Sequence, residues 1–211
     1  MSPFITMLDR GGFPPITSTS VVVDIGSNEG QEIEPFVNTG CEIHSFEPHP
    51  KLFRELEKKY SSFKNVHLNE LAAWKSDTKM KFYYKKSLSN NSTVNGGASL
   101  IGAKENIDLE LNVEVDCIDI AKYILNLNKT INFLKIDAEG AEYEILNRLF
   151  ETNAYQKIDH IYYEDHSRKI NVKTGSRYEK LLLDHENKWR KLKNEVLLKY
   201  KENNIVLNNW H

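Results

Sequence analysis

The stretch VVVDIGSNEG at residues 21–30 constrains the fold of this chain more than any other feature. Its first five residues are β-branched and apolar except for one aspartate, which is typical of a buried strand in a parallel sheet. Gly26 lets the chain turn sharply at the strand end, and Gly30 lets the next segment pack closely. We therefore expect a strand, a tight turn and a helix over residues 29–39 that ends at Gly40.

Further along the chain, short apolar runs alternate with charged segments that have helical spacing. Such alternation with short connections predicts a parallel sheet wound by right-handed crossovers. The expected fold class is α/β, with a mostly parallel, doubly wound sheet and helices on both faces. The further expected strands are residues 41–48, 66–74, 131–137, 160–166 and 204–210, and the expected helices are residues 50–60, 120–125, 140–150 and 177–202.

Residues 79–119 interrupt this alternation. KMKFYYKK (79–86) and LNVEVDCID (111–119) alternate polar and apolar residues with a period of two, as antiparallel strands do. We expect them to form a small antiparallel addition to the main sheet. The connection at 88–106 is long, polar and contains glycines, so we interpret it as a lid or substrate loop, with a disordered surface excursion as the alternative.

The composition suits one globular domain of 211 residues, and the net charge of −2 offers no basic field for nucleic acid. No run approaches 18 apolar residues and no secretory signal is visible, so we expect a soluble cytoplasmic protein without a membrane span. Cys41 and Cys117 are expected to be buried free thiols rather than a disulfide or metal site. We expect a single domain at residues 20–211 after an irregular lead-in or linker at residues 1–19, which also suits a domain of a larger protein.

The glycine turn is a candidate site for a nucleotide-like ligand, because such ligands lie at the carboxyl ends of parallel strands. Its D-x-G-x-x-x-G spacing differs from the G-x-G-x-x-G of dinucleotide enzymes. Glu47 ends the next strand, where a carboxylate can accept both hydroxyls of a ribose. The alternatives are a turn that serves packing alone and a charge that stabilises a helix N-terminus. The candidate cofactor-binding residues are Asp24, Gly26, Ser27, Asn28, Gly30 and Glu47, with Asn69 and Ala72 expected beside the base.

Ionisable residues gather at the ends of two later strands. LKIDAEGAE brings Lys135, Asp137 and Glu139 to one strand end, and YYEDH brings Glu164 and His166 to the next. Burying such ionisable groups at a strand end costs free energy unless they are ion-paired or take part in binding or catalysis. A Lys135–Asp137 ion pair is the structural alternative, as is a surface hydrogen bond for His166. His166 is otherwise the natural general base near neutral pH.

Together these motifs resemble the FkbM family of methyltransferases over about residues 21–166. The hallmark is LKIDAEGAEYEIL, which is very close to the family's K-I-D-x-E-G-A-E signature. VVVDIGSNEG, SFEPHP, GGASL and YYEDH follow the family's order and spacing. The resemblance implies a Rossmann-like class I methyltransferase fold and S-adenosylmethionine as cofactor. It also implies methyl transfer to a hydroxyl oxygen, with a saccharide of the 6-deoxyhexose type as the best candidate acceptor.

The resemblance also suggests a role for each strand-end residue. We assign His166, Asp137 and Lys135 to catalysis, with His166 as the expected general base. We assign Glu139, Glu164 and, from the GGASL match, Ser99 to acceptor binding. An oxygen-rich set of this kind also suits Mg²⁺ or Ca²⁺, for which the candidate ligands are Asp137, Glu139, Glu164 and His166.

Some features depart from the family pattern. Ser27 and Glu29 stand in the glycine turn where smaller or apolar residues are common. A single strand follows residue 166 instead of an antiparallel pair, and the long helix at 177–202 is a candidate contact for a homo-oligomer. Two other functions stay open from the sequence: an NAD(P)-dependent Rossmann oxidoreductase, and a non-catalytic methyltransferase-like module of a larger glycan-building protein.

Overall fold

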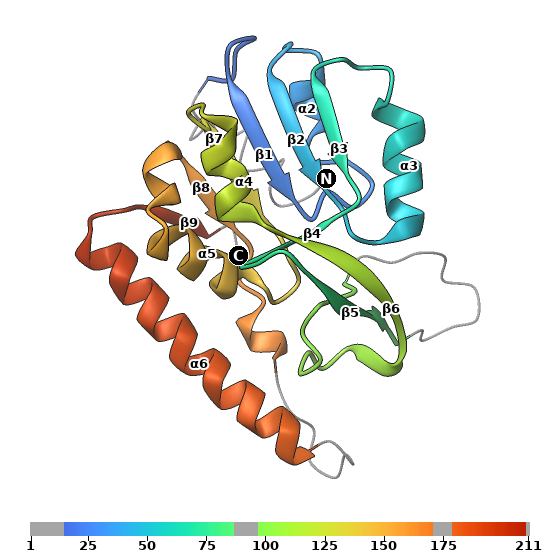
Figure 1. Ribbon diagram of the computed structural model, residues 1–211, viewed down its shortest axis with the longest axis vertical. Helices are drawn as coiled ribbons and strands as arrows, with labels where there is room; N and C mark the ends of the chain where they lie inside the picture. Colours follow the sequence, from blue (N-terminus) through green and yellow to red (C-terminus); the bar gives the residue numbers. More distant parts are fainter. Residues whose placement is uncertain (1–14, 87–96, 171–178, 210–211) are drawn as a thin grey trace.

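The computed structural model describes residues 15–86, 97–170 and 179–209, with the side chains of the last range described from residue 186 onward (Figure 1). Its centre is a six-stranded parallel sheet with the strand order β3-β2-β1-β7-β8-β9. The order reverses between β1 and β7, and open α/β sheets bind ligands at the carboxyl ends of such a reversal. The strands are β1 (Val21–Ile25), β2 (Glu42–Phe46), β3 (Val66–Asn69), β7 (Phe133–Ile136), β8 (Ile161–Tyr163) and β9 (Leu207–Asn209).

Helices cover both faces of this sheet, which confirms the predicted doubly wound arrangement. Alternation along β1 explains how: Val22 packs with the helices of one face, while Val23 and Ile25 pack with those of the other. The first face is covered by α2 (Glu34–Val37) and α3 (Pro50–Tyr60), and the second by α4 (Ile120–Leu127), α5 (Glu142–Glu151) and α6 (Glu179–Glu202). Short 3₁₀ helices lie at Ala154–Lys157 and Ser167–Lys169.

A second, three-stranded sheet has the order β4-β6-β5 and lies below the ends of the parallel strands in the view of Figure 1. It consists of β4 (Ala72–Trp74), β5 (Thr78–Lys85) and β6 (Ile107–Asp119). Strands β5 and β6 pair antiparallel, as expected for the addition around 79–119. The first parallel sheet and this second sheet share one hydrophobic core, which contains Ile25 and Leu134 together with Ala73, Phe82 and Val115.

The prediction of one strand over 66–74 is wrong. The chain pairs with β2 only to Asn69, and after Leu71 it pairs with β6 instead. All three residues of β4 are buried in the core between the two sheets. An apolar run shows that a strand is buried, but not which partner strand completes its hydrogen bonds.

The helix predicted over 29–39 is limited to the four residues of α2. Asn28 and Gly30 have positive φ angles of 52° and 80°, which a right-handed helix does not allow, so this segment forms turns before Glu34. Strand β8 likewise ends at Tyr163, so Glu164 and His166 lie beyond the strand rather than on it.

The C-terminal part agrees with the sequence where it is described. The expected final strand is β9, which pairs parallel to β8. The start of the long helix predicted from 177, the larger part of the 1–19 lead-in, and residues 88–96 of the expected lid lie outside the described residues. Among the residues that are described, the helices are too short or too polar to cross a membrane. Both cysteines are buried free thiols.

Candidate active site

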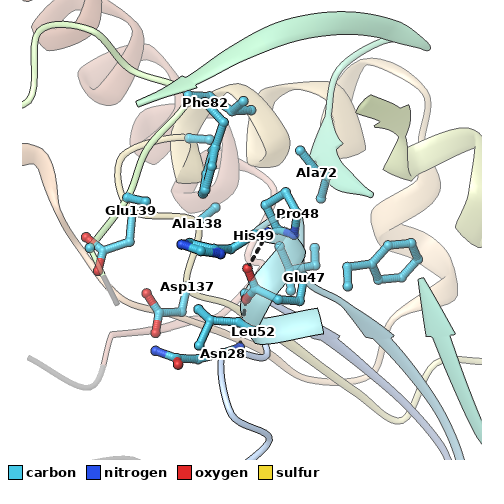
Figure 2. Close-up of a pocket in the computed structure, with 18 residues that line it drawn as sticks. Asn28, Glu47, Pro48, His49, Leu52, Ala72, Phe82, Asp137, Ala138 and Glu139 are labelled. Atoms are coloured by element: carbon cyan, nitrogen blue, oxygen red, sulfur yellow. Dashed lines mark hydrogen bonds between the residues drawn. The ribbon is translucent and has the colours of Figure 1, made fainter. Parts of the chain in front are cut away.

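A pocket lies at the carboxyl ends of β1, β2 and β7, where the strand order reverses (Figure 2). It encloses about 600 Å³, part of which is open to solvent. Glu47, Asp137 and Glu139 border it, and Phe82 of the second sheet stands over it.

The turn after β1 forms the floor of the pocket, and Gly26 is essential to its shape. Gly26 has a φ angle of +78°, and a Cβ at this position would lie 1.8 Å from the carbonyl oxygen of Asp137. Its amide and that of Ser27 both donate to the carbonyl oxygen of Phe46, at 2.9 and 3.1 Å. Only glycine allows the ends of β1, β2 and β7 to approach so closely.

Glu47 provides an anionic group in the pocket wall. It is only 5% exposed, and its two carboxylate oxygens accept the backbone N–H groups of Asn28 and His49, each at 2.8 Å (Figure 2). Burial raises the pKa of Glu47 to about 7, against the effect of these two hydrogen bonds. Each carboxylate oxygen keeps a further lone pair. The group is therefore fixed to accept two adjacent hydroxyls, such as those of a ribose.

The wall next to Glu47 is apolar and suits a flat ring. Ala72 and Ala73 lie in it, as does Phe82, and the two small side chains leave space between the sheets. Asn69, predicted beside the base, lies away from this wall, because its amide donates to the carbonyl oxygens of Ser45 and His67.

Four predicted residues support the pocket from behind rather than line it. Lys135 is 1% exposed; its Nζ lies 3.0 Å from Asp24 Oδ1 and donates to the Gly26 carbonyl oxygen at 3.1 Å. Burial opposes its charge, but Asp24 and Asp137 outweigh burial and raise the pKa of Lys135. A catalytic Lys135 does not fit this buried ion pair. Asp24, Ser27 and Gly30 are also turned away from the pocket, with Gly30 packed against Tyr60 and Leu56.

His166 lies beyond the Asp137 side of the pocket, surrounded by carboxylates. Its Nδ1 is 2.9 Å from Glu142 Oε1. Its Nε2 is 3.1 Å from Glu164, 3.3 Å from Glu139 and 4.0 Å from Asp137. The structure therefore brings together four of the predicted residues, and 2% of His166 remains exposed.

This environment changes the chemistry expected of His166. Burial lowers its pKa, but the hydrogen bonds to Glu142 and Glu164 outweigh burial and raise the pKa to about 10. An imidazolium at neutral pH has no lone pair to accept a proton, so the general-base role predicted for His166 does not fit its surroundings. Burial raises the pKa of Asp137 to about 8, with Lys135 opposing and Glu164 adding to the effect.

Several residues at the site were not predicted. Glu142 is fully buried, and its Oε1 accepts from the amides of Ala138 and Gly140 and faces Nδ1 of His166. Lys104 is buried and ion-paired with Glu139. The sequence gives little sign that Glu142 and Lys104 belong to the site, because they are remote from each other in the chain and come near His166 and Glu139 only in the folded structure. Ser99, in contrast, was predicted to bind the acceptor; it is buried behind the wall, and its hydroxyl donates to the Glu139 carbonyl oxygen at 2.7 Å.

The sheet order, the glycine turn of β1 and the buried acid at the end of β2 define a Rossmann-like fold of the methyltransferase type. The Methyltransferase FkbM domain model matches residues 24–188, which is most of the chain. The protein thus belongs to the FkbM methyltransferase family, and the oxidoreductase alternative is set aside. No curated protein and no solved structure matches the chain.

Proposed function

We propose that the protein transfers a methyl group from S-adenosylmethionine to a hydroxyl oxygen, and that the acceptor is a saccharide of the 6-deoxyhexose type. One observation carries the cofactor part: Glu47 is buried in the wall of a pocket at the sheet reversal, with both oxygens fixed by backbone amides. The saccharide part rests on the family resemblance and on the acidic, hydrogen-bonding residues at the other end of the pocket.

The charges around the pocket favour a cationic ligand. Asp137 and Glu139 line it, and Glu164 and Glu142 lie close behind, whereas His166 and Lys104 supply the nearby cations. Lys135 is a third cation, 3.0 Å from Asp24 and 3.8 Å from Asp137. With Asp24 counted, five carboxylates outnumber three cations, so the local potential is negative when the acids are ionised. A sulfonium carries a positive charge, so this field attracts the methyl donor and not its neutral thioether product.

Bound S-adenosylmethionine would supply a methyl group on a leaving sulfonium. The protein must then orient the acceptor and receive its proton. In our proposal the ionised form of Asp137 takes the hydroxyl proton as the C–O bond forms. Asp137 lines the pocket, and its pKa of about 8 makes it a stronger base than an ordinary carboxylate while leaving part of it ionised near neutral pH. A general base contributes about 10²–10⁴-fold, and alignment of the acceptor contributes about 7–11 kcal/mol. His166 holds the carboxylates in place as a cation.

A divalent metal stays a separate prediction. Asp137, Glu164 and His166 each have a ligand atom within 4.8 Å of the others, which suits Mg²⁺ or Ca²⁺. A metal would have to compete with the proton that these carboxylates hold on His166. Activity that is unchanged by EDTA would remove the metal from the reaction.

Calorimetric titration with S-adenosylhomocysteine tests the cofactor part. Glu47→Ala should weaken binding about a hundredfold, because it removes two charge-assisted hydrogen bonds. Glu57→Ala, on the exposed side of α3, is the matched control and should bind as the wild type does. NAD should not bind. Equal affinities of the two variants would refute the ribose assignment, and no binding by the wild type would favour the non-catalytic module.

Activity with labelled S-adenosylmethionine and a panel of saccharides, with and without EDTA, tests the transfer. Asp137→Asn should lower the rate at least about a hundredfold while S-adenosylhomocysteine still binds. A variant as fast as the wild type would show that another group receives the proton.

A further inference from the structure

Lys104 is a buried lysine that the function proposed so far uses only as a nearby charge. It lies in the connection between β5 and β6, and only 3% of the residue is exposed. Its ammonium forms an ion pair with Glu139 and donates to the Gly97 carbonyl oxygen at 2.8 Å. A buried ammonium is costly unless its partners are well placed. Burial indeed lowers the pKa of Lys104, and Glu139 opposes this effect.

The residues around Lys104, at 97–105, form a segment that contacts three parts of the molecule, and we call it the 97–105 segment. Ser99 pairs with Tyr83 of β5 through two backbone hydrogen bonds of 2.8 and 2.9 Å. Ser99 Oγ donates to the Glu139 carbonyl oxygen at 2.7 Å. The Glu105 amide donates to the carbonyl oxygen of Lys169, just after His166, at 2.8 Å. The segment therefore joins β5, the β7–α5 turn and the segment after β8.

Glu139 is the residue on which this segment rests. Its φ angle of +50° is uncommon for a residue other than glycine, so surrounding contacts must stabilise it. Oε2 pairs with Lys104 and lies 3.3 Å from Nε2 of His166. Oε1 faces Gly97, 3.6 Å from where a Cβ of that glycine would be. Lys104 thus fixes one carboxylate oxygen while the other faces the pocket wall.

The same segment forms part of that wall. Gly97, Ala98 and Leu100 line the pocket, next to the turn that carries Asp137 and Glu139. Lys104 binds both sides at once, since it holds the Gly97 carbonyl on one and the Glu139 carboxylate on the other. Without this tie, the hydrogen bond from Ser99 is the one that still joins the wall to Glu139 among the residues that the structure describes.

We propose that Lys104 is a positioning residue of the cofactor pocket, which ties the 97–105 segment to Glu139 and so holds the pocket wall in its binding conformation. The inference rests on the proposed function for the identity of the ligand. The tie between Lys104 and Glu139 is independent of the proposed function, because it can be measured in the protein without ligand.

The test compares Lys104→Met with Lys79→Met, which removes an exposed lysine from β5. S-adenosylhomocysteine should bind about tenfold more weakly to Lys104→Met and within about twofold of the wild type to Lys79→Met. In hydrogen exchange of the free proteins, the amides of the 97–105 segment should exchange faster in Lys104→Met while those of β1 do not change. Unchanged exchange in that segment would overturn the proposal.

A double-mutant cycle with Glu139→Gln separates the tie from a general loss of stability. If Lys104 acts through Glu139, the double variant should bind S-adenosylhomocysteine about as weakly as the weaker single variant. If the loss of affinity in the double variant equalled the product of the two single losses, the proposal would be overturned. If Lys104→Met does not fold, the test uses Glu139→Gln instead, in which the amides of the 97–105 segment should exchange faster than in the wild type. A wild type that binds no S-adenosylhomocysteine would defeat the proposed function, while the exchange comparison would still decide the tie.

Discussion

At the scale of single residues, the site depends on ionisable groups whose burial is compensated by specific partners. Glu47 is fixed by two backbone amides, Lys135 by Asp24, and His166 by Glu142 and its neighbours. Each group is nearly excluded from water, so its protonation depends on its partners more than on its residue type. The pH dependence of binding and stability therefore reports directly on these contacts.

Glu47 should link ligand binding to proton release. Its pKa of about 7 means that much of it is protonated at pH 6, and hydroxyl donors from a ribose favour the ionised form. Affinity for S-adenosylhomocysteine should rise about tenfold from pH 6 to pH 8. Calorimetry at pH 6.5 in buffers of different ionisation enthalpy should detect a released proton. Glu47→Gln should release none, and equal release by both proteins would assign the proton elsewhere.

His166 should make folding stability fall as the pH rises above 6.5. Its pKa in the folded protein, about 10, is above the ordinary 6.5, so its contribution is complete below pH 6.5 and disappears as the pH passes 10. The contribution at pH 7 is on the order of 4 kcal/mol. Urea unfolding in EDTA at several pH values should show this fall in the wild type and in His160→Gln. If His166→Gln showed the same fall, the imidazolium assignment would be wrong.

At the scale of elements, the pocket exists because three strand ends meet at one turn. Short apolar runs predicted β1, β2 and β7, and the order of strands and helices predicted their parallel pairing. The sequence did not predict that the chain changes sheets between β3 and β4, because the two pieces are separated by only two residues and read as one extended run. Yet this change places Ala72 and Phe82 over the pocket.

Gly26→Ala should disrupt the close approach of β1, β2 and β7 at their carboxyl ends, and Gly40→Ala is a matched control. Both glycines have φ angles of +78°. A Cβ on Gly40 would lie 3.5 Å from Ser18, an ordinary contact, whereas on Gly26 it would overlap the Asp137 carbonyl oxygen. Gly40→Ala should cost about 1 kcal/mol and Gly26→Ala several kcal/mol more in urea unfolding. Equal losses would mean that the turn can move away from β7.

At the scale of the whole molecule, the two sheets share a single hydrophobic core. Phe82 and Val115 of the second sheet belong to the same buried cluster as Ile25 and Leu134 of the first. Arg148 of α5 reinforces this by an ion pair of 2.6 Å with Asp119 at the end of β6. The second sheet therefore should not unfold on its own. The single domain at residues 20–211 stays a prediction, as does a homo-oligomer formed through α6.

Unfolding in urea should accordingly show one transition, with tryptophan fluorescence and circular dichroism coinciding. S-adenosylhomocysteine at a hundred times its dissociation constant should raise the free energy of unfolding by about 2.7 kcal/mol in that single transition. Two transitions, of which the ligand shifts only one, would show that the sheets are separate folding units.

The sequence by itself determined the α/β class, the glycine turn, the acid at the end of β2 and the family. These depend on local chemistry: the period of apolar residues, the φ angle that only glycine accepts readily, and a motif of adjacent residues. It also placed Asp137, Glu139, Glu164 and His166 at neighbouring strand ends, because parallel strands end at the same edge.

Only the tertiary structure decided what these residues do to one another. The sequence favoured His166 as a base from its ordinary pKa, but four carboxylates around it hold the proton. The sequence singled out Lys135 and not Lys104, yet both are buried cations: Lys135 supports the floor of the pocket and Lys104 ties its wall. Burial and charge pairing set these roles, and both depend on distances between segments that are remote in the chain.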